Sequence, residues 1–238
     1  MTEVREWPFA VAGGERPKVT ALVCTLNEAE NLPHVLPKIP SWVDEVLLVD
    51  GHSTDDTVRV ATKLHPDARI VQQPGKGKGD ALRYGIEQAA GDVVVMLDAA
   101  GSMDPAEMPR FIAPLLEGYD FVKGSRFMKG GGTADMERHR VFGNWVFTTL
   151  TNVFHGSRYT DLCYGYNAFW RDRFLAVGFS SDGFEVETEI NIRIRKARLK
   201  VLEVPSYEAS RLNGKGNLRS FHDGWRILRT IFLEVVRR

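Results

Sequence analysis

Six polar side chains follow directly after short apolar segments of the chain, where a ligand could reach them. They are Thr25, Asn27, Glu28, Asp50, His52 and Asp98. Carboxylates at neighbouring strand ends suit the hydroxyls of a ribose and the coordination of a metal ion, since both need oxygen acceptors. In an open parallel sheet, ligands bind beyond the carboxyl ends of the strands. The positions therefore predict a binding site at that edge.

A glycine-rich loop at 74–80 carries two lysines, Lys76 and Lys78. Lysines at the start of a helix suit phosphate oxygens, so a nucleotide is the simplest ligand for the whole set. The loop lacks the Gly-x-x-x-x-Gly-Lys-Ser/Thr spacing of a Walker loop. It also lacks the Gly-x-Gly-x-x-Gly spacing of a dinucleotide fingerprint and follows the third expected strand, not the first. A hydride-transferring enzyme is therefore disfavoured.

Strand and helix patterns alternate through the first half of the chain and would position these residues. Apolar, β-branched segments predict four strands, at 19–26, 45–50, 68–72 and 93–97. Helix-start signals follow them, among them Asn27 with Glu30 three residues on, and Ser53. Strands joined by helical crossovers predict a doubly wound α/β half with a right-handed parallel sheet.

The second half of the chain is less regular. Its patterns predict helices at 105–117, 138–154 and 185–197, strands at 121–127 and 199–207, and a glycine loop at 129–135. We expect a single α/β domain with a mostly parallel sheet flanked by helices. The expected divisions are a leader at 1–17, the domain at 18–220 and a C-terminal amphipathic helix at 221–238. Within the domain, 18–104 would bind the nucleotide and 105–220 the acceptor.

Composition narrows the class of protein. The 238 residues are 43% hydrophobic, enough for a large core, and 31 basic residues balance 31 acidic ones, which disfavours nucleic acid as a partner. Cys24 and Cys163 sit among apolar residues and predict reduced, buried thiols. The first residues lack the apolar core of a signal peptide, and no apolar run approaches the roughly 20 residues that span a bilayer. We expect a soluble, cytoplasmic protein.

A series of short motifs runs through the chain in a fixed order. They are Val-Cys-Thr-Leu-Asn-Glu at 23–28, Val-Asp-Gly-His-Ser-Thr-Asp at 49–55, Lys-Gly at 76–77, Gly-Asp-Val at 91–93, Leu-Asp-Ala at 97–99, Val-Lys-Gly-Ser-Arg-Phe at 122–127, Thr-Asp-Leu-Cys-Tyr-Gly-Tyr at 160–166, Val-Pro at 204–205 and Arg-Leu-Asn-Gly-Lys-Gly-Asn-Leu at 211–218. Together they resemble glycosyltransferase family 2, in particular its dolichol-phosphate mannose synthase-like and polyprenyl-phosphate glycosyltransferase-like members. The resemblance implies a GT-A fold, a GDP- or UDP-sugar donor, Mg²⁺ or Mn²⁺, and inversion at the anomeric carbon.

The resemblance assigns a donor side by position. Thr25, Asn27 and Glu28 would border the base and ribose, and Asp50 would take the edge of either. The full set expected there is Thr25, Asn27, Glu28, Asp50, His52, Lys76, Lys78, Asp98 and Ala99.

The Asp-x-Asp metal motif of the family is incomplete in this chain. Its first carboxylate falls on Asp98, but the second position holds Ala100, whose methyl group offers no ligand to a hard cation. We favour the hypothesis that this substitution, natural or engineered, impairs the enzyme, since the other motifs are intact. The alternative is compensation by Ser102 and Asp104.

By the same resemblance, Arg126 and Arg211, with Lys215, would meet the phosphates, and Asp161 belongs to the acceptor side. A lipid phosphate is already ionised at neutral pH and needs no general base. A hydroxyl acceptor needs a carboxylate. The candidates for that carboxylate are Asp161, Glu185, Glu187 and Glu189. The expected catalytic set is Asp98, Asp161, Arg126, Arg211 and Glu187.

The C-terminal segment carries an apolar stripe at helical spacing. It consists of Trp225, Leu228, Ile231, Phe232, Val235 and Val236, with arginines beside it. We favour packing against the domain or dimerisation over peripheral contact with the inner face of a membrane, although a basic amphipathic helix suits an anionic bilayer.

Each candidate also has a structural alternative: Thr25 and Asn27 as helix-entry residues, the loop lysines as solubilising groups, Arg211 as a turn residue. The order of the motifs favours function. We predict an inverting hexosyltransferase with polyprenyl phosphate as the favoured acceptor. The alternatives are a transferase acting on a glycan or small-molecule hydroxyl, and a nucleotide-sugar-binding module with little turnover.

Overall fold

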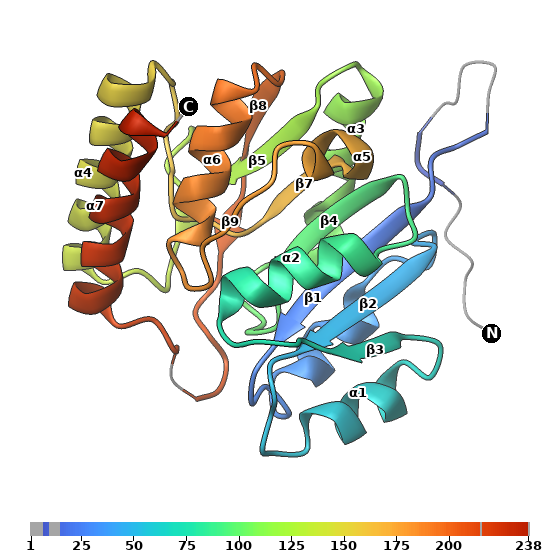
Figure 1. Ribbon diagram of the computed structural model, residues 1–238. Helices are drawn as coiled ribbons and strands as arrows, with labels where there is room; N and C mark the ends of the chain where they lie inside the picture. The colour runs from blue at the N-terminus through green and yellow to red at the C-terminus, as the bar shows by residue number, and fades with distance from the viewer. Residues whose placement is uncertain (1–6, 10–14, 215, 238) are drawn as a thin grey trace.

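A computed structural model describes residues 7–9, 15–214 and 216–237 as an α/β structure (Figure 1). One sheet holds seven strands in the order β3-β2-β1-β4-β7-β5-β8. In chain order they are β1 (Val19–Thr25), β2 (Glu45–Asp50), β3 (Arg69–Gln72), β4 (Val93–Asp98), β5 (Phe121–Ser125), β7 (Asn167–Trp170) and β8 (Val201–Pro205). All these pairings are parallel except those of β7 with β4 and β5. The predicted mostly parallel sheet is confirmed.

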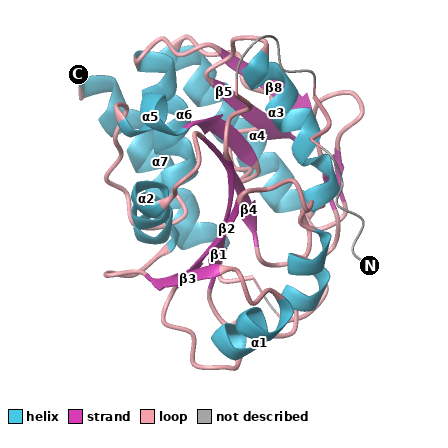
Figure 2. Ribbon diagram, turned by 90° about the vertical axis from the view of Figure 1, so that its right-hand side faces the viewer, coloured by secondary structure: helices cyan, strands magenta, loops and turns pink. Residues whose placement is uncertain are grey.

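Helices lie on both sides of this sheet, as Figure 2 shows. They are α1 (Thr57–Leu64), α2 (Lys78–Gln88), α3 (Met108–Leu116), α4 (Arg138–His155), α5 (Arg171–Leu175), α6 (Val186–Lys196) and α7 (Ser220–Val236), with the 3₁₀ turns η1 (Leu32–His34), η2 (Leu36–Lys38) and η3 (Pro105–Glu107). One core joins the sheet to α2, α5 and α6, and another joins it to η1, η2 and α3.

The central strands are apolar on both faces because helices cover both. In β1, Ala21 and Leu22 point to opposite faces and both are fully buried. β4 lies between β1 and β7, so the most continuous apolar run does occupy the middle of the sheet. Its neighbour β7 is antiparallel, which the sequence did not predict.

The segment after β1 differs from the expected α-helix. Asn27 adopts a left-handed conformation with φ of 56°, which asparagine tolerates better than most residues. The two 3₁₀ turns η1 and η2 follow in place of an α-helix, and each contains a proline in its first turn. Pro33 and Pro37 lack the backbone N–H that an α-helix would need there, so the helix cannot propagate.

The remaining helices predicted from the sequence are confirmed, whereas two strands end earlier than expected. β5 stops at Ser125 and β8 stops at Pro205. Beyond them, β6 (Gly132–Thr133) pairs with β9 (Tyr207–Glu208) in a separate two-stranded sheet. Residues 1–6 and 10–14 of the expected leader lie outside the described residues, while Trp7 and Phe9 pack against the core.

α4 and α7 lie side by side at one end of the sheet (Figure 1). The ring of Phe154 lies 5.2 Å from that of Phe232, and His139 contacts Ser220 at 3.2 Å, so both helices start at the same end. Within the described residues, no helix is long and apolar enough to cross a membrane.

Candidate functional site

A cleft of about 620 Å³ opens at the carboxyl ends of β1 and β4. The N-terminus of α2 borders it, as do the segments that lead into α4 and α7. Expected site residues in its lining are Thr25, Glu28, Lys78, Asp98, Ala99, Ala100, Arg126, Glu187 and Arg211. The cleft therefore lies where an open parallel sheet binds its ligand.

Other expected residues lie outside this lining. They are Asn27, Asp50, His52, Lys76 and Asp161. Asn27 joins the loops after β1 and β2: its amide N donates to Ser53 Oγ at 2.9 Å, and its Oδ1 accepts from the Thr54 amide at 2.8 Å. His52 Nε2 lies 3.1 Å from the Gly75 carbonyl, and Lys76 is exposed.

Asp50 is 3% exposed and offers one unused acceptor. Its Oδ2 accepts from the Ser53 amide at 3.1 Å. Its Oδ1 is buried and has no hydrogen-bond partner among the described residues. A buried carboxylate oxygen without a partner is costly, and the next residue, Gly51, lines the cleft. Asp50 thus keeps one unsatisfied acceptor next to a lining residue, although it does not line the cleft itself.

Lys78, at the N-terminus of α2, is held between two carboxylates. Its Nζ lies 2.9 Å from Asp98 Oδ1 and 2.7 Å from Glu187 Oε1. Burial by itself lowers the pKa of Lys78, but the charges and hydrogen bonds of Asp98 and Glu187 outweigh it and raise the pKa above its ordinary value. Lys78 is therefore a permanent cation in the cleft, contributed by α2 and held by β4 and α6.

The residues around Asp98 do not fit a divalent cation. Ala100 lines the cleft with a methyl group, and Asp98 is already paired with Lys78. Ser102 also lines the cleft, but Asp104 is exposed and its Oδ1 accepts from the Ala106 amide at 3.0 Å. Among the described residues, no group of three His, Cys, Asp or Glu side chains is placed to hold a metal. A hard cation needs several oxygen ligands at once, and this donor set does not supply them.

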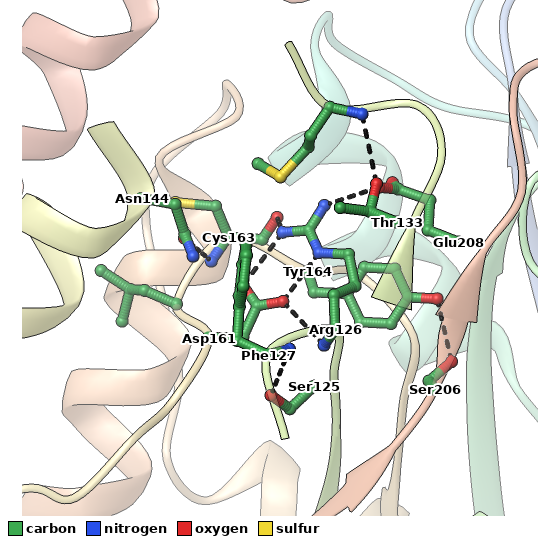
Figure 3. Close-up of polar contacts among 12 residues, drawn as sticks. Ser125, Arg126, Phe127, Thr133, Asn144, Asp161, Cys163, Tyr164, Ser206 and Glu208 are labelled. Atoms are coloured by element: carbon green, nitrogen blue, oxygen red, sulfur yellow. Dashed lines mark hydrogen bonds and ion pairs between the residues drawn. The ribbon is translucent and has the colours of Figure 1, made fainter. Parts of the chain in front are cut away.

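Arg126 is the centre of a buried ionic cluster (Figure 3). Its Nε donates to Asp161 Oδ2 at 2.7 Å and its Nη2 to Asp161 Oδ1 at 2.9 Å, a bidentate pair. Its Nη1 donates to Glu208 Oε2 at 3.0 Å, and Glu208 also accepts from Thr133 Oγ1 at 2.7 Å. The ring of Tyr164 lies 4.6 Å from the guanidinium. The cluster joins the end of β5, β9 and the 160–166 loop at the wall of the cleft, which Arg126, Tyr164 and Glu208 line.

This arrangement limits what Asp161 can do. Its side chain is fully buried, and both oxygens accept from Arg126. Burial would raise the pKa of Asp161, but the adjacent guanidinium outweighs burial and holds the pKa below its ordinary value. A carboxylate that is neither accessible nor basic is poorly suited to general-base catalysis, so its contacts favour a role in positioning Arg126.

Arg211 and Glu28 form a second pair that faces the cleft. Arg211 Nη2 donates to Glu28 Oε1 at 2.5 Å, and its Nε donates to the Asn213 carbonyl at 2.8 Å. Glu28 Oε2 accepts from Asn31 Nδ2 at 2.6 Å. The pair therefore fastens the 211–213 segment onto the loop after β1. Lys215, expected beside Arg211, lies outside the described residues.

Of the three glutamates at 185–189, only Glu187 lines the cleft among the described residues. Glu185 pairs with Arg226 at 2.6 Å, which ties α6 to α7. Glu189 pairs with Arg193 at 2.6 Å and accepts from the Ser181 amide at 2.7 Å. Alternate residues of one helix cannot face the same side, which explains the separation.

Several lining residues escaped the sequence prediction. They include Gln73, Asp135, Glu137, Arg140 and Ser220. Gln73 directly follows β3, so its place at a strand end could have indicated it. The other four depend on how the 129–135 loop and the starts of α4 and α7 fold over the sheet, which no local pattern records. Gly165, noted only as part of a motif, packs its backbone against the Lys78 pair: a Cβ there would lie 2.8 Å from Glu187 Oε1.

The two cysteines also line the cleft and are free thiols. Burial raises the pKa of Cys24 and of Cys163 to about 12. Both therefore stay protonated at neutral pH and are weak nucleophiles.

Comparison with known proteins gives a consistent result. The family model described as "Glycosyl transferase family 2" matches residues 20–178. Glycosyltransferase AglJ of Haloferax volcanii is 36% identical over 228 residues, which cover 92% of this chain and 71% of that protein. The undecaprenyl-phosphate mannosyltransferase of Micrococcus luteus is 29% identical, with coverage of 79% and 82%. The chain spans about half the length of another relative, the hexosyltransferase Agl6 of Haloferax volcanii, to which it is 29% identical.

A solved structure has the same arrangement of elements. Glucosyl-3-phosphoglycerate synthase from Mycobacterium tuberculosis, crystallised with Mn²⁺, uridine diphosphate and phosphoglyceric acid, superposes with a TM-score of 0.74 at 20% sequence identity. The match covers 92% of this chain and 79% of that one. At this identity the likeness concerns the fold.

Proposed function

The chain belongs to glycosyl transferase family 2 and has the GT-A fold, and from this premise we propose that it moves a hexose from a GDP- or UDP-sugar to polyprenyl phosphate with inversion. The family makes it a glycosyltransferase. The donor, the acceptor and the stereochemistry are proposals. The observation that carries them is one cleft that brings the ends of β1 and β4 together with Lys78 and Arg211.

The donor side of the proposal uses the cleft between α2 and the strand ends. The N-terminus of α2, with its partial positive charge, and the Lys78 ammonium both border the cleft, a combination that suits a diphosphate. The unpartnered Oδ1 of Asp50 suits a hydroxyl of the ribose or an N–H of the base. Thr25 and Glu28 line the same cleft.

The acceptor side is supported by a surface that we call the α4–α7 apolar surface. It consists of the exposed side chains of Phe142, Trp145, Val153, Phe154, Phe221, Trp225, Phe232, Val235 and Val236. Within these two helices the acidic residues, Asp223 and Glu234, are buried, while Arg138 and Arg229 are exposed. An apolar surface with basic neighbours suits an anionic bilayer.

This surface leads to the cleft. Arg140 and Ser220, at the starts of α4 and α7, both line the cleft. A polyprenyl chain lying against the α4–α7 apolar surface could therefore place its phosphate in the cleft. The relative named undecaprenyl-phosphate mannosyltransferase fits an acceptor of this chemistry.

The transfer itself is a single displacement. An oxygen of the lipid phosphate attacks the anomeric carbon, the bond from that carbon to the donor's diphosphate oxygen breaks, and the nucleoside diphosphate leaves with the electron pair. Attack from the face opposite the leaving group inverts the configuration. The phosphate is ionised beforehand, so no proton has to be removed. This chain's residues align the two substrates and hold positive charge beside the leaving group.

A hydroxyl acceptor, the alternative, would need a carboxylate that is free to take a proton. Asp161 is buried against Arg126, and Glu187 Oε1 is held by Lys78 at 2.7 Å. These contacts favour the phosphate acceptor.

Transfer of radiolabelled sugar from GDP-mannose and from UDP-glucose to undecaprenyl phosphate in vesicles tests the proposal. We expect an organic-soluble labelled product from one of the two donors. Labelling of glycans or soluble alcohols, with none of the lipid, would support the hydroxyl alternative. Donor binding without any transfer would support the binding module.

A further inference from the structure

The Lys78 ammonium lies beside Asp98 at the end of β4, where the second aspartate of the family's metal motif is missing. Its Nζ contacts Asp98 Oδ1 at 2.9 Å and Glu187 Oε1 at 2.7 Å. The side chain is 13% exposed, so the ammonium is largely withdrawn from water. The backbone of Gly165 packs against it, and the ring of Phe184 lies 6.0 Å from the nitrogen. The lysine is thus enclosed on several sides and fixed in position.

An ammonium group has three N–H donors. The two carboxylates of Asp98 and Glu187 take two of them, and the residue lines the cleft. In the part of the chain that the structure describes, no other acceptor contacts the ammonium, so the third donor is left for an oxygen of the ligand. Glu187 itself is only 9% exposed at its side chain, so its charge is directed at Lys78 and not at solvent.

We propose that the Lys78 ammonium, fixed by Asp98 and Glu187, is the cation that receives the donor's diphosphate, so that this chain binds its nucleotide without a divalent metal. The inference rests on the proposed function and specifies how its donor site works. It also explains why alanine can replace the second aspartate of the metal motif at position 100. Where a lysine supplies the positive charge, a second aspartate at that position has no cation to hold.

Removing the lysine should make nucleotide binding depend on a divalent metal. In Lys78→Met the charges of Asp98 and Glu187 face each other and the diphosphate without compensation, which opposes binding. The same two carboxylates then become free to hold Mn²⁺, because the ammonium no longer competes for them. The variant should therefore lose nucleotide affinity in EDTA and regain part of it with Mn²⁺.

Calorimetric titration with UDP and with GDP, in EDTA and in excess Mn²⁺, tests the inference on the unmodified protein. We expect one nucleotide to bind in EDTA with a Kd that Mn²⁺ changes by less than about threefold. Binding that requires Mn²⁺ would overturn the inference and leave the proposed function standing. Binding of neither nucleotide under either condition would overturn the proposed function and the inference with it.

Two variants complete the test. Lys78→Met should weaken binding in EDTA by at least about tenfold and should acquire an Mn²⁺ response, seen also as the loss of the free Mn²⁺ signal in electron paramagnetic resonance. Lys63→Met removes the same charge from the exposed side of α1 and should bind like the unmodified protein. Equal affinities of Lys78→Met and the unmodified protein in EDTA would contradict the assignment, and thermal unfolding shows whether each variant is folded.

Discussion

Two kinds of charged residue can be separated at the scale of single side chains. Arg126 borders the cleft, but its side chain is only 2% exposed and is satisfied by the buried Asp161, whereas Lys78 and Arg211 line the cleft and are 13% and 17% exposed. The family resemblance placed Arg126 and Arg211 at the phosphates and Asp161 on the acceptor side, and the glycine loop indicated phosphate for Lys78. The contacts divide them into residues that maintain the cleft and residues that can meet a ligand.

Asp161→Asn tests whether the buried pair of Arg126 and Asp161 maintains the structure of the cleft. At neutral pH it should lower the free energy of unfolding by about 3 kcal/mol, because it leaves a buried guanidinium without its counter-charge. The folded pKa of Asp161 is below its usual 3.8, so its contribution is complete at neutral pH and is lost as the pH falls through the folded value. Urea unfolding should therefore show a difference that persists to about pH 4 and shrinks below it.

Asp56→Asn is the matched control, since Asp56 forms an exposed pair with Arg59. It should leave stability nearly unchanged. A similar effect of both substitutions would contradict the role assigned to the buried cluster.

Ala100→Asp tests the incomplete metal motif. The added carboxylate would stand two residues from Asp98 and supply the oxygen ligand that the methyl group lacks. Because Lys78 occupies Asp98, the test is made in the Lys78→Met background, where we expect Ala100→Asp to increase the effect of Mn²⁺ on nucleotide affinity by about a further tenfold. Ala100→Asn, similar in shape but neutral, should show a much smaller response. No additional Mn²⁺ response from Ala100→Asp in that background would refute the hypothesis that Ala100 removed a metal ligand.

At the scale of elements, the start of α2 determines where Lys78 lies. The Gly79 amide donates to the Asp182 carbonyl at 2.8 Å, and a Cβ on Gly79 would overlap the Ser181 carbonyl oxygen. Gly79→Ala should therefore push α2 away from the 181–183 segment. We expect it to lower the free energy of unfolding by about 1–3 kcal/mol and to weaken nucleotide binding.

Gly216→Ala is the comparison for stability, because among the described residues no atom beyond its chain neighbours lies within 4 Å of the position its Cβ would take. Chemical unfolding and calorimetry measure both effects. Unchanged stability in Gly79→Ala would mean that α2 is not held by this contact.

Local patterns predicted the elements that depend on local sequence. The strands of the first half appear as apolar runs because helices cover both of their faces, and α2, α4 and α6 have helical periodicity of adequate length. β7 escaped prediction because its four residues pair with β4 and β5, which lie far away in the chain. The α-helix predicted after β1 was wrong, because two prolines follow the helix-start signal there and prevent the helix from continuing.

The candidate site was predictable in its residues but not in their pairing. Strand-end positions and the glycine loop located Thr25, Lys78 and Asp98 correctly in one cleft. That Lys78 would join Asp98 to Glu187, 109 residues away from the lysine, depends on the packing of α6 against the sheet. Spacing along the chain carries no information about such a contact.

At the scale of the whole molecule, the α4–α7 apolar surface and the cleft are parts of one arrangement. Ile227 and Ile231 of α7 are buried against the domain, while Trp225 and Phe221 point to solvent. One face of α7 therefore packs in the core, and the other presents apolar side chains to the outside. Deleting α7 would remove the core residues together with the exposed ones. Substitution of exposed residues separates the two roles.

Trp225→Glu should weaken association with anionic vesicles, because it places a negative charge in a surface suited to an anionic bilayer. Its effect on transfer should depend on the acceptor. With undecaprenyl phosphate in vesicles, we expect a several-fold rise in KM and little change in kcat, while a short, water-soluble prenyl phosphate should be used as before. Val58→Glu, at an exposed apolar position on α1 that lies outside the α4–α7 apolar surface, should leave the use of both acceptors unchanged. A loss of rate with both acceptors in Trp225→Glu would place the defect in the cleft and contradict a separate lipid-facing surface.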